Sequence, residues 1–270
     1  MPTPPKDSLV IIGAGNVASH LAPALHRAGY EVRAVFSRNI NHAQPLADKV
    51  GAEAACSLET LPEADIFFYC VSDDALPTVA EALCKRFPDA LHVHTSGSSP
   101  LSVFPAARCG VAYPLQTFSR GADVDFRHVR MFIEGKNDDC CKKIASVCKK
   151  ISNFVTEMRT DQRLWLHLAS VFACNFANHC FALAADILHE KANLPFEVLL
   201  PLVDATVEKA HYLPPAAGQT GPAARNDQRI MQLHERLLAD NSLRLSIYEA
   251  MSQSIRRTAE AGKHDSTSTK

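Results

Sequence analysis

Strand-like runs alternate with amphipathic stretches over the first 158 residues. Such runs occur at residues 9–12, 31–36, 66–71, 90–94 and 111–113, and the stretches between them have helical periodicity. This alternation is typical of a parallel, doubly wound sheet with helices on both faces. Beyond residue 158 apolar positions recur only at helical spacing. The pattern predicts an α/β sheet domain at residues 1–158, an all-helical domain at 159–262 and a disordered tail at 263–270.

A glycine-rich turn joins the first apolar run to the first helical stretch. Gly13 and Gly15 permit a tight turn and a close approach of the backbone to a phosphate, and Ala18 lets the helix pack on the strand. The free N–H groups of the first helical turn attract a pyrophosphate. An ordinary strand-to-helix turn is the alternative, but the run at 31–36 closes a βαβ unit of the expected length. A Rossmann-like domain is therefore predicted, with these cofactor-binding residues: Gly13, Ala14, Gly15, Asn16 and Val17.

The end of the second strand-like run distinguishes NADP from NAD. NAD-binding domains usually place Asp or Glu here to hold the ribose 2′-hydroxyl. This chain has Ser37 and Arg38 instead. A serine hydroxyl can bind a phosphate, and a guanidinium can pair with one and stack on adenine. The two residues favour NADP as the cofactor, the alternative being that Arg38 is a solvated loop arginine.

Polar residues follow two later runs. Ligands bind beyond the carboxyl ends of strands in open α/β sheets. We therefore expect Val71 and Ser72 to flank the cofactor, and Thr95 and Ser96 to lie beside its nicotinamide. The hydroxyls of the second pair could meet a carboxamide or a substrate carbonyl.

The segment from residue 92 to 99 also allows structural interpretations. It can form a turn with a helix N-cap at Ser98 or Ser99, since a proline follows. His92 and His94 share a strand face and could pair on a metal. No third ligand stands at a suitable spacing, so hydrogen-bonded core histidines are favoured and no metal site is predicted.

The stretch at 161–192 predicts one long, largely apolar helix. His167 and Asn175 are polar positions on it that need partners. Imidazole titrates near neutrality, so His167 could donate the proton that accompanies hydride addition to C=O or C=N. A histidine hydrogen-bonded across a helical interface is equally compatible with the pattern.

Two further polar segments could either bind the substrate or have a purely structural role. Gln116 could wall a substrate pocket or belong to a turn. Arg225 could clamp a substrate carboxylate. The structural alternative, in which Asp227 caps a helix and pairs with Arg225, is slightly favoured.

Composition limits the partners. The formal net charge of −1 gives no sign of a nucleic-acid or anionic-membrane partner. The apolar runs are interrupted before membrane-spanning length, and residues 1–7 lack an apolar signal core. Nine scattered cysteines, with no C-x-x-C pair, indicate reduced thiols and a cytoplasmic location. A helix as long and apolar as 161–192 needs cover, which predicts a homodimer through the helical domain rather than a monomeric bundle.

Taken together, the motifs resemble an uncharacterised bacterial family of Rossmann-like proteins with a helical C-terminal domain of unknown function, often labelled NADP oxidoreductases. More distantly the chain is similar to pyrroline-5-carboxylate reductases, ketopantoate reductases and 3-hydroxyisobutyrate dehydrogenases. The resemblance covers nearly the whole chain. It is carried, in order, by the glycine motif at 13–18, HTSGS at 94–98, YPLQ at 113–116, His167 with Asn175, and TGPAARND at 220–227.

One departure from these relatives affects the mechanism. The hydroxyacid dehydrogenases carry a catalytic Lys on the first helix after the sheet domain, and no Lys lies between residues 161 and 190 here. We expect an NADP-dependent oxidoreductase that transfers a hydride between nicotinamide and a small carbonyl or imine substrate in the interdomain cleft. His167 is the expected acid/base, Asn175 orients the substrate and Ser96 is an auxiliary donor. The alternatives are a non-catalytic NADP-binding sensor that acts through its dimer, and a deazaflavin-linked NADP reductase.

Overall fold

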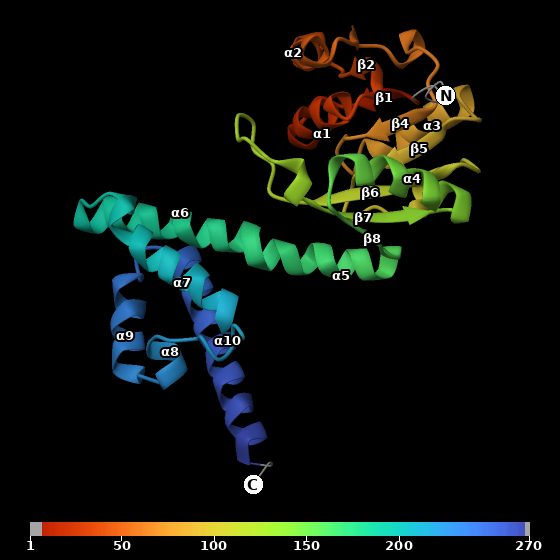
Figure 1. Cartoon of the computed structure of the whole chain (residues 1–270). Coiled ribbons are helices and arrows are strands. Elements are labelled where there is room, and N and C mark those ends of the chain that lie inside the picture. The colour runs from red at the N-terminus through yellow and green to blue at the C-terminus, as the bar shows by residue number, and fades with distance from the viewer. Residues whose placement is uncertain (1–6, 268–270) are drawn as a thin grey trace. The chain divides into compact units, whose positions relative to one another are not determined.

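The computed structural model describes residues 7–267, and the side chains of residues 7–261. An eight-stranded sheet forms the N-terminal part of the chain (Figure 1), in the order β3-β2-β1-β4-β5-β6-β7-β8. The strands are β1 (Ser8–Ile12), β2 (Glu31–Phe36), β3 (Glu53–Ala55), β4 (Ile66–Tyr69), β5 (Leu91–His94), β6 (Cys109–Leu115), β7 (Arg130–Gly135) and β8 (Phe154–Glu157).

All neighbouring strands pair in parallel except β6 and β7. The prediction of a doubly wound sheet is confirmed, with this one antiparallel pair as a difference. A parallel return needs a crossover of a dozen or more residues, usually a helix. The β6–β7 connection carries only the short 3₁₀ turn η3 (Phe126–His128), so β7 returns antiparallel.

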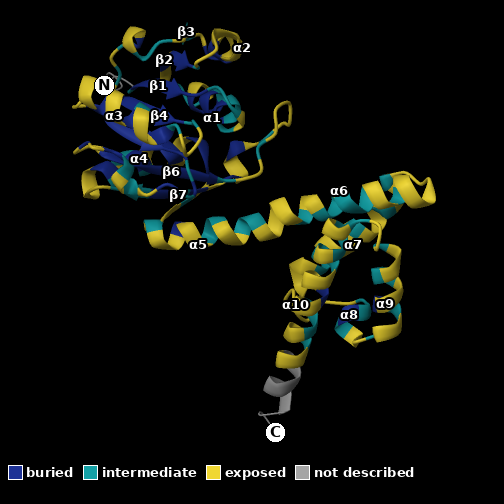
Figure 2. Ribbon diagram, turned by 180° about the vertical axis from the view of Figure 1, so that it is seen from behind, coloured by how far each residue is buried: buried dark blue, intermediate teal, exposed yellow. Residues whose placement is uncertain are grey.

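Helices cover both faces of the sheet, and alternating strand residues pack against them. Leu9 and Ile11 point to the core shared with helices α1, α2 and α4, whereas Val10 and Ile12 point to the core on the α3 side. Figure 2 shows the sheet as the buried part of the chain. The helices are α1 (Asn16–Arg27), α2 (Ile40–Val50), α3 (Leu76–Arg86) and α4 (Asp138–Ile151), with short turns η1 (Leu58–Thr60) and η2 (Leu101–Val103).

A continuous helix follows the sheet, as predicted for residues 161–192. It consists of α5 (Thr160–Ser170), the π-helical turn η4 (Val171–Phe176), α6 (Ala177–Ile187) and a second π turn, η5 (Leu188–Ala192). The remaining elements are η6 (Phe196–Leu199), α7 (Leu200–Tyr212), α8 (Pro222–Arg225), α9 (Gln228–Leu237) and α10 (Ser242–Thr267). The predicted succession of a Rossmann-like sheet and a helical region is therefore confirmed.

The chain divides into two compact units, the sheet unit (Met1–Asn175) and the helical unit (Phe176–Lys270). The predicted boundary at residue 158 stands at the start of α5, whereas this division falls inside the continuous helix. Helix α10 runs through Thr267, into the segment predicted as a disordered tail, and residues 268–270 lie outside the described part. All nine cysteines are free thiols.

The helix Thr160–Ala192 is long and apolar enough to cross a membrane by length and composition. It has 33 residues and a mean hydropathy of 1.4 over its most apolar window. Polar residues such as His167 and Asn175 interrupt its apolar runs, which is why no membrane-spanning segment was predicted from the sequence. Core helices of soluble proteins pass the same test, so one such helix is weak support for a membrane span.

Candidate functional site

The strand order reverses between β1 and β4: the chain continues from β1 to β2 on one side and from β4 to β5 on the other. Both connections begin at the carboxyl ends of these two strands, at the same edge of the sheet. Crevices of this kind, outside the carboxyl ends of the strands, are where open α/β sheets bind ligands. The carboxyl ends of β1, β2, β4, β5 and β6 all lie at this edge, because these strands pair in parallel. The predicted cofactor residues follow β1, β2, β4 and β5, so the sheet brings them to one edge.

Glycine is required at position 13 by both space and conformation. Its φ is +113°, and an added Cβ would collide with the backbone carbonyl of Cys70. Gly13 donates its N–H to the carbonyl of Phe36 (2.8 Å), and Cys70 donates to the carbonyl of Ile12 (2.7 Å). The turn is thereby locked between β2 and β4.

Gly15 has a different role in the same turn. No atom lies within 4 Å of the position of a Cβ at Gly15, so space is open in front of it. The start of α1 has no side-chain cap and no acidic residue in its first turn. Its N–H groups thus remain available to an anion, which the helix dipole also favours. The residues fit a dinucleotide pyrophosphate.

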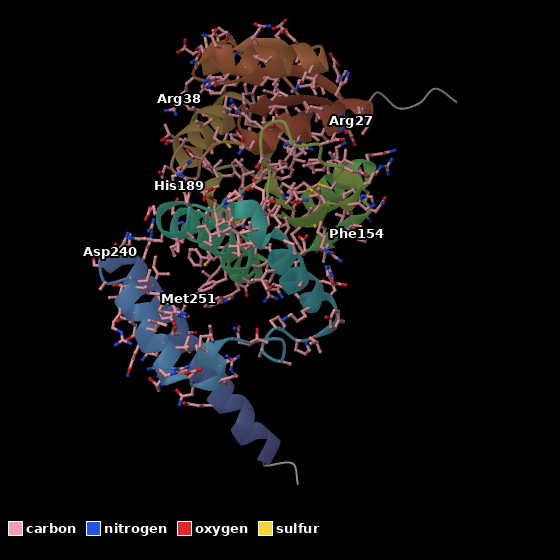
Figure 3. The ribbon with its side chains drawn as sticks, turned by 90° about the vertical axis from the view of Figure 1, so that its left-hand side faces the viewer. Arg27, Arg38, Phe154, His189, Asp240 and Met251 are labelled. Atoms are coloured by element: carbon pink, nitrogen blue, oxygen red, sulfur yellow. The ribbon has the colours of Figure 1, made fainter. Side chains whose placement is uncertain are left out.

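No carboxylate stands at the end of β2. Asn39 caps α2 by accepting a hydrogen bond from the N–H of Asn41 (3.0 Å), and Ser37 accepts one from the N–H of Asn39 (3.4 Å). Arg38 is exposed at the surface of the sheet unit (Figure 3), and no ion pair engages it in the described chain. The segment offers a hydroxyl, an amide and a guanidinium to the cofactor's ribose.

The turns after β4 and β5 are joined through Asp73. Ser98 donates its hydroxyl to Asp73, and the Ser99 hydroxyl donates to the same carboxylate (3.2 Å). Burial raises the pKa of Asp73, but hydrogen bonds from the serines outweigh it, and the pKa lies below its usual value. Asp73 follows Val71 and Ser72 in the segment expected to flank the cofactor, but its serine partners, 25 and 26 residues away, could not be predicted.

Ser96 shapes the turn after β5. Its hydroxyl accepts hydrogen bonds from the N–H groups of Ser98 (3.1 Å) and Ser99 (2.8 Å). The residue at the N-cap of the following 3₁₀ turn η2 is Pro100. The expected N-cap at Ser98 or Ser99 is therefore wrong, because the capping acceptor of this segment is the Ser96 hydroxyl, bonded within the turn.

The two histidines of β5 are buried and hydrogen-bonded. His92 binds the Tyr69 hydroxyl through Nδ1 (2.7 Å) and the carbonyl of Phe87 through Nε2 (2.9 Å). His94 Nδ1 accepts the N–H of Ser96 (3.2 Å). Burial, with a further contribution from Arg163, lowers the pKa of His94 to about 3, so this ring is neutral at physiological pH. Within residues 7–261, no three His, Cys, Asp or Glu side chains gather in a group suited to a metal ion.

His167 lies against the turn after β5. A Cβ at Gly97 would stand 2.6 Å from His167 Nδ1 and 2.9 Å from Cζ of Tyr113, so glycine is needed for the two rings to approach. The Tyr113 hydroxyl lies 3.3 Å from the same nitrogen. Burial raises the pKa of Tyr113, so its hydroxyl stays protonated and can donate. An imidazole and a phenol therefore stand together beside residues 95–97.

A buried arginine fixes the start of α5, and hence His167 one turn later. Arg163 is 1% exposed. It donates through Nη1 to Oε2 of Glu134 (2.6 Å) and through Nη2 to the Ser99 carbonyl (2.6 Å). Thr160 donates its hydroxyl to the same Glu134 oxygen (2.7 Å). Arg163 was not among the predicted site residues; the sequence signal for it is a charge four residues before His167 on an apolar helix.

Three other predicted positions lie apart from this group. Asn175 is exposed in the π turn η4, with no hydrogen bond to the residues around His167 in the described chain. Gln116 accepts the N–H of Thr117 (2.8 Å), as in the turn interpretation. Asp227 caps α9 by accepting the N–H of Ile230 (3.2 Å), while the described side chains show no Arg225–Asp227 pair.

Two family models match the chain, and the second begins within the sheet, just before β7. Residues 8–95 match the family described as NADP oxidoreductase coenzyme F420-dependent, and residues 129–255 match a domain of unknown function, DUF2520. No curated protein matches significantly. Among solved structures, the chain is similar to the putative NADP oxidoreductase BF3122 from Bacteroides fragilis. The identity is 40%, the TM-score is 0.88, and 93% of this chain and 98% of that chain are covered.

Two functionally described structures share the fold at lower identity. An imine reductase from Pseudomonas sp. is 20% identical with a TM-score of 0.62, covering 96% of this chain and 95% of that chain. A pyrroline-5-carboxylate reductase from Coxiella burnetii is 15% identical with a TM-score of 0.55, covering 95% and 98%. At these identities the likeness concerns the fold alone.

Proposed function

Because this chain belongs to the NADP oxidoreductase family that joins a nucleotide-binding domain to a DUF2520 domain, we propose that it transfers a hydride between NADP and a small carbonyl or imine substrate. The observation that carries the proposal is the placement of His167. Its ring contacts Gly97 and the Tyr113 hydroxyl at the carboxyl edge of the sheet, next to the turn assigned to the nicotinamide.

The chemistry follows from this placement. Hydride addition to C=O or C=N leaves negative charge on oxygen or nitrogen, which a positioned acid neutralises. His167 supplies the proton as the imidazolium, whose Nδ1–H donates to the Tyr113 oxygen and so orients the ring. After the transfer, the neutral ring accepts a hydrogen bond from the Tyr113 hydroxyl at the same nitrogen. The nucleotide supplies the hydride when bound. In the opposite direction the same imidazole accepts the proton.

The remaining predicted groups take supporting roles. Thr95 and Ser96 line the nicotinamide side, with the Ser96 hydroxyl mainly engaged in holding its own turn. Asn175 stands eight residues beyond His167, about 12 Å along a helix axis. It can therefore orient only the part of the substrate distant from the reacting atom.

The cofactor preference is testable at the end of β2. We expect Ser37→Asp to weaken NADPH binding about tenfold or more and to improve NADH binding, because a carboxylate repels a 2′-phosphate and accepts the 2′-hydroxyl. Titration of wild type and variant with both nucleotides, followed by nicotinamide fluorescence, measures the ratio. Ser146→Asp, at an exposed position on α4, is the control. An unchanged NADPH/NADH ratio in Ser37→Asp contradicts the assignment.

Turnover separates an enzyme from a sensor. NADPH oxidation is followed with keto acids and cyclic imines as hydride acceptors. Turnover with either class supports the proposal. NADPH binding with no turnover on any acceptor favours the non-catalytic sensor. Turnover that appears only with an added deazaflavin favours the deazaflavin-linked reductase, the second cofactor being the one that the family description names.

We further propose a homodimer through the helical unit, in a cytoplasmic protein. Within residues 176–261 the buried side chains are Ala223, Met231 and Ser252, too few for an independent core. Large apolar side chains are exposed instead, including Leu202 (66%) and Leu243 (70%). Surfaces of this kind mark association sites, and the same unit of a second copy offers a matching apolar surface.

Light scattering is expected to give about twice the 29.5 kDa chain mass for the wild type. Leu202→Glu and Leu243→Glu are expected to lower it toward one chain, because each places a charge on the apolar surface. Glu208→Ala, an exposed polar position on α7, is expected to leave the mass unchanged. A wild type that elutes as a folded monomer contradicts the dimer.

A further inference from the structure

The loop between β6 and β7, residues 116–125, is fastened onto the glycine turn and the first turns of α1. The Asn16 side chain donates to the carbonyl of Phe118 (3.0 Å), and His20 Nε2 donates to the carbonyl of Ser119 (3.0 Å). In the reverse direction, Arg120 Nη2 donates to the carbonyl of Ala14 (3.2 Å). These contacts join segments about 100 residues apart, so the loop covers the start of α1.

Packing and turn geometry hold the loop in place. The Phe118 ring stacks on Phe126 with ring centroids 5.8 Å apart and lies 5.2 Å from the His20 ring. A turn at residues 119–122 closes with a hydrogen bond from the N–H of Ala122 to the carbonyl of Ser119 (3.2 Å). Gly121 in this turn has φ +83°, a conformation that suits glycine. Arg120 is thus presented from a defined turn.

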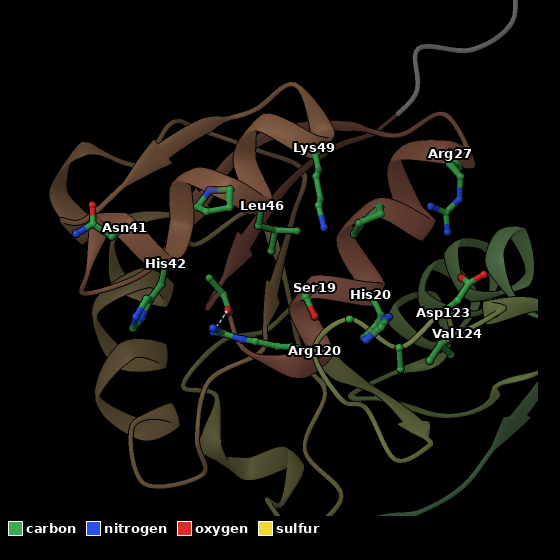
Figure 4. Close-up of a pocket in the computed structure, with 15 residues that line it drawn as sticks. Ser19, His20, Arg27, Asn41, His42, Leu46, Lys49, Arg120, Asp123 and Val124 are labelled. Carbon is green, nitrogen blue, oxygen red and sulfur yellow. Dashed lines mark hydrogen bonds between the residues drawn. The ribbon is translucent and has the colours of Figure 1, made fainter.

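A cavity of about 530 Å³ separates α1, α2 and this loop. Ala14, His42 and Arg120 line it near the glycine turn, and Arg27 and Lys49 line it near the carboxyl ends of the helices. Figure 4 shows Arg120 extending from the loop to the glycine turn, with the hydrogen bond to Ala14 drawn. The charged guanidinium therefore borders the place assigned to the pyrophosphate.

No carboxylate neutralises Arg120 within the described chain, where its one hydrogen bond is to Ala14. One Nη2–H bond leaves the other N–H groups of the guanidinium available. The glycine turn supplies backbone N–H groups to a pyrophosphate but no full positive charge, and none of its residues is basic. A loop arginine at this point completes the charge of the site.

We infer that Arg120 is a further cofactor-binding residue, which contacts the pyrophosphate of the dinucleotide while the 116–125 loop covers it. The inference rests on the proposed function, since it requires that a dinucleotide bind at the glycine turn. Asn16 and His20 hold the covering loop through its backbone, and Arg120 supplies the charge. Nucleotide release then requires these contacts to open.

The test is titration of NADPH and NADH into wild type, Arg120→Gln, Arg120→Lys and Arg27→Gln. Arg27 lines the same cavity but is 11 residues beyond Asn16 on α1, about 16 Å along the helix axis. Arg120→Gln is expected to weaken both nucleotides about five- to tenfold, as for a lost charge-assisted hydrogen bond. Arg120→Lys is expected to lose less, and Arg27→Gln less than twofold. The Arg120 side chain is exposed, and thermal unfolding verifies that each variant is folded.

Each contrary outcome has a distinct meaning. A wild type that binds neither nucleotide overturns the proposed function itself. A wild type that binds, with Arg120→Gln binding equally well, overturns the inference alone. A loss confined to NADPH assigns Arg120 to the 2′-phosphate and overturns the pyrophosphate contact. Equal losses of affinity in Arg120→Gln and Arg27→Gln show that the positive charges of the cavity act through their general electrostatic field rather than by a contact from Arg120. That outcome also overturns the inference.

Discussion

Arg163→Met is expected to destabilise the sheet unit by about 3–5 kcal/mol, the size typical of breaking a buried ion pair by removing one partner. Methionine fills much of the arginine's volume but leaves Glu134 charged beneath α5, with its side chain 18% exposed. The Ser99 carbonyl also loses its 2.6 Å donor. The expected result is a lower midpoint in urea unfolding followed by far-UV circular dichroism.

Arg159→Met is the matched control for this substitution. Arg159 lies one helical turn earlier and pairs with Asp161, but their side chains are 74% and 65% exposed. Exposed pairs contribute about 0–1 kcal/mol, so the control should unfold close to wild type. Equal midpoints for Arg163→Met and Arg159→Met would show that the buried pair does not hold α5 on the sheet. Glu134→Gln, which keeps the shape and removes the charge, then reports the other half of the pair.

The sheet and the glycine turn follow from local sequence, which explains why both could be predicted. The apolar runs at residues 9–12 and 66–69 are strands buried on both faces, and a strand of this kind is continuously apolar in sequence. Gly13 adopts a positive φ, which favours glycine, so the residue type itself marks the turn. The antiparallel β6–β7 pair was not predicted, because β6 is buried along its length like the parallel strands and shows no alternation that would distinguish it.

Contacts between distant segments are the part that the sequence conceals. Arg163 and Glu134 are 29 residues apart, and Arg120 and Ala14 are 106 apart. Each of these four residues stands in a stretch with an ordinary local interpretation: a helix, a strand, a loop and a glycine turn. Their partnership depends on strand order, which brings β6, β7 and the glycine turn near residues that no periodicity connects. The π turns are concealed too, because one extra residue per turn hardly alters the helical pattern.

His167→Gln is expected to lower kcat for NADPH oxidation by about 10²–10⁴-fold, the usual contribution of a general acid or base. Glutamine can still hydrogen-bond to Tyr113 but cannot deliver a proton at neutral pH. NADPH affinity should change less than twofold, because the glycine turn and residues 37–38 carry nucleotide binding. His179→Gln, an exposed histidine further along the same continuous helix, is the control and should retain wild-type kcat.

Gly97→Ala tests the position of the ring without changing its chemistry. The added methyl would stand 2.6 Å from His167 Nδ1 and 2.9 Å from its Cγ, so the imidazole must move away from the turn. Catalysis is sensitive to displacements of about 1 Å, so kcat should fall by about 10²-fold with a much smaller change in NADPH affinity. If both variants keep wild-type turnover, His167 is a structural histidine and the proton comes from another group. If His167→Gln alone loses activity, the ring acts from a position that tolerates the methyl group, and Gly97 is required for packing rather than for catalysis.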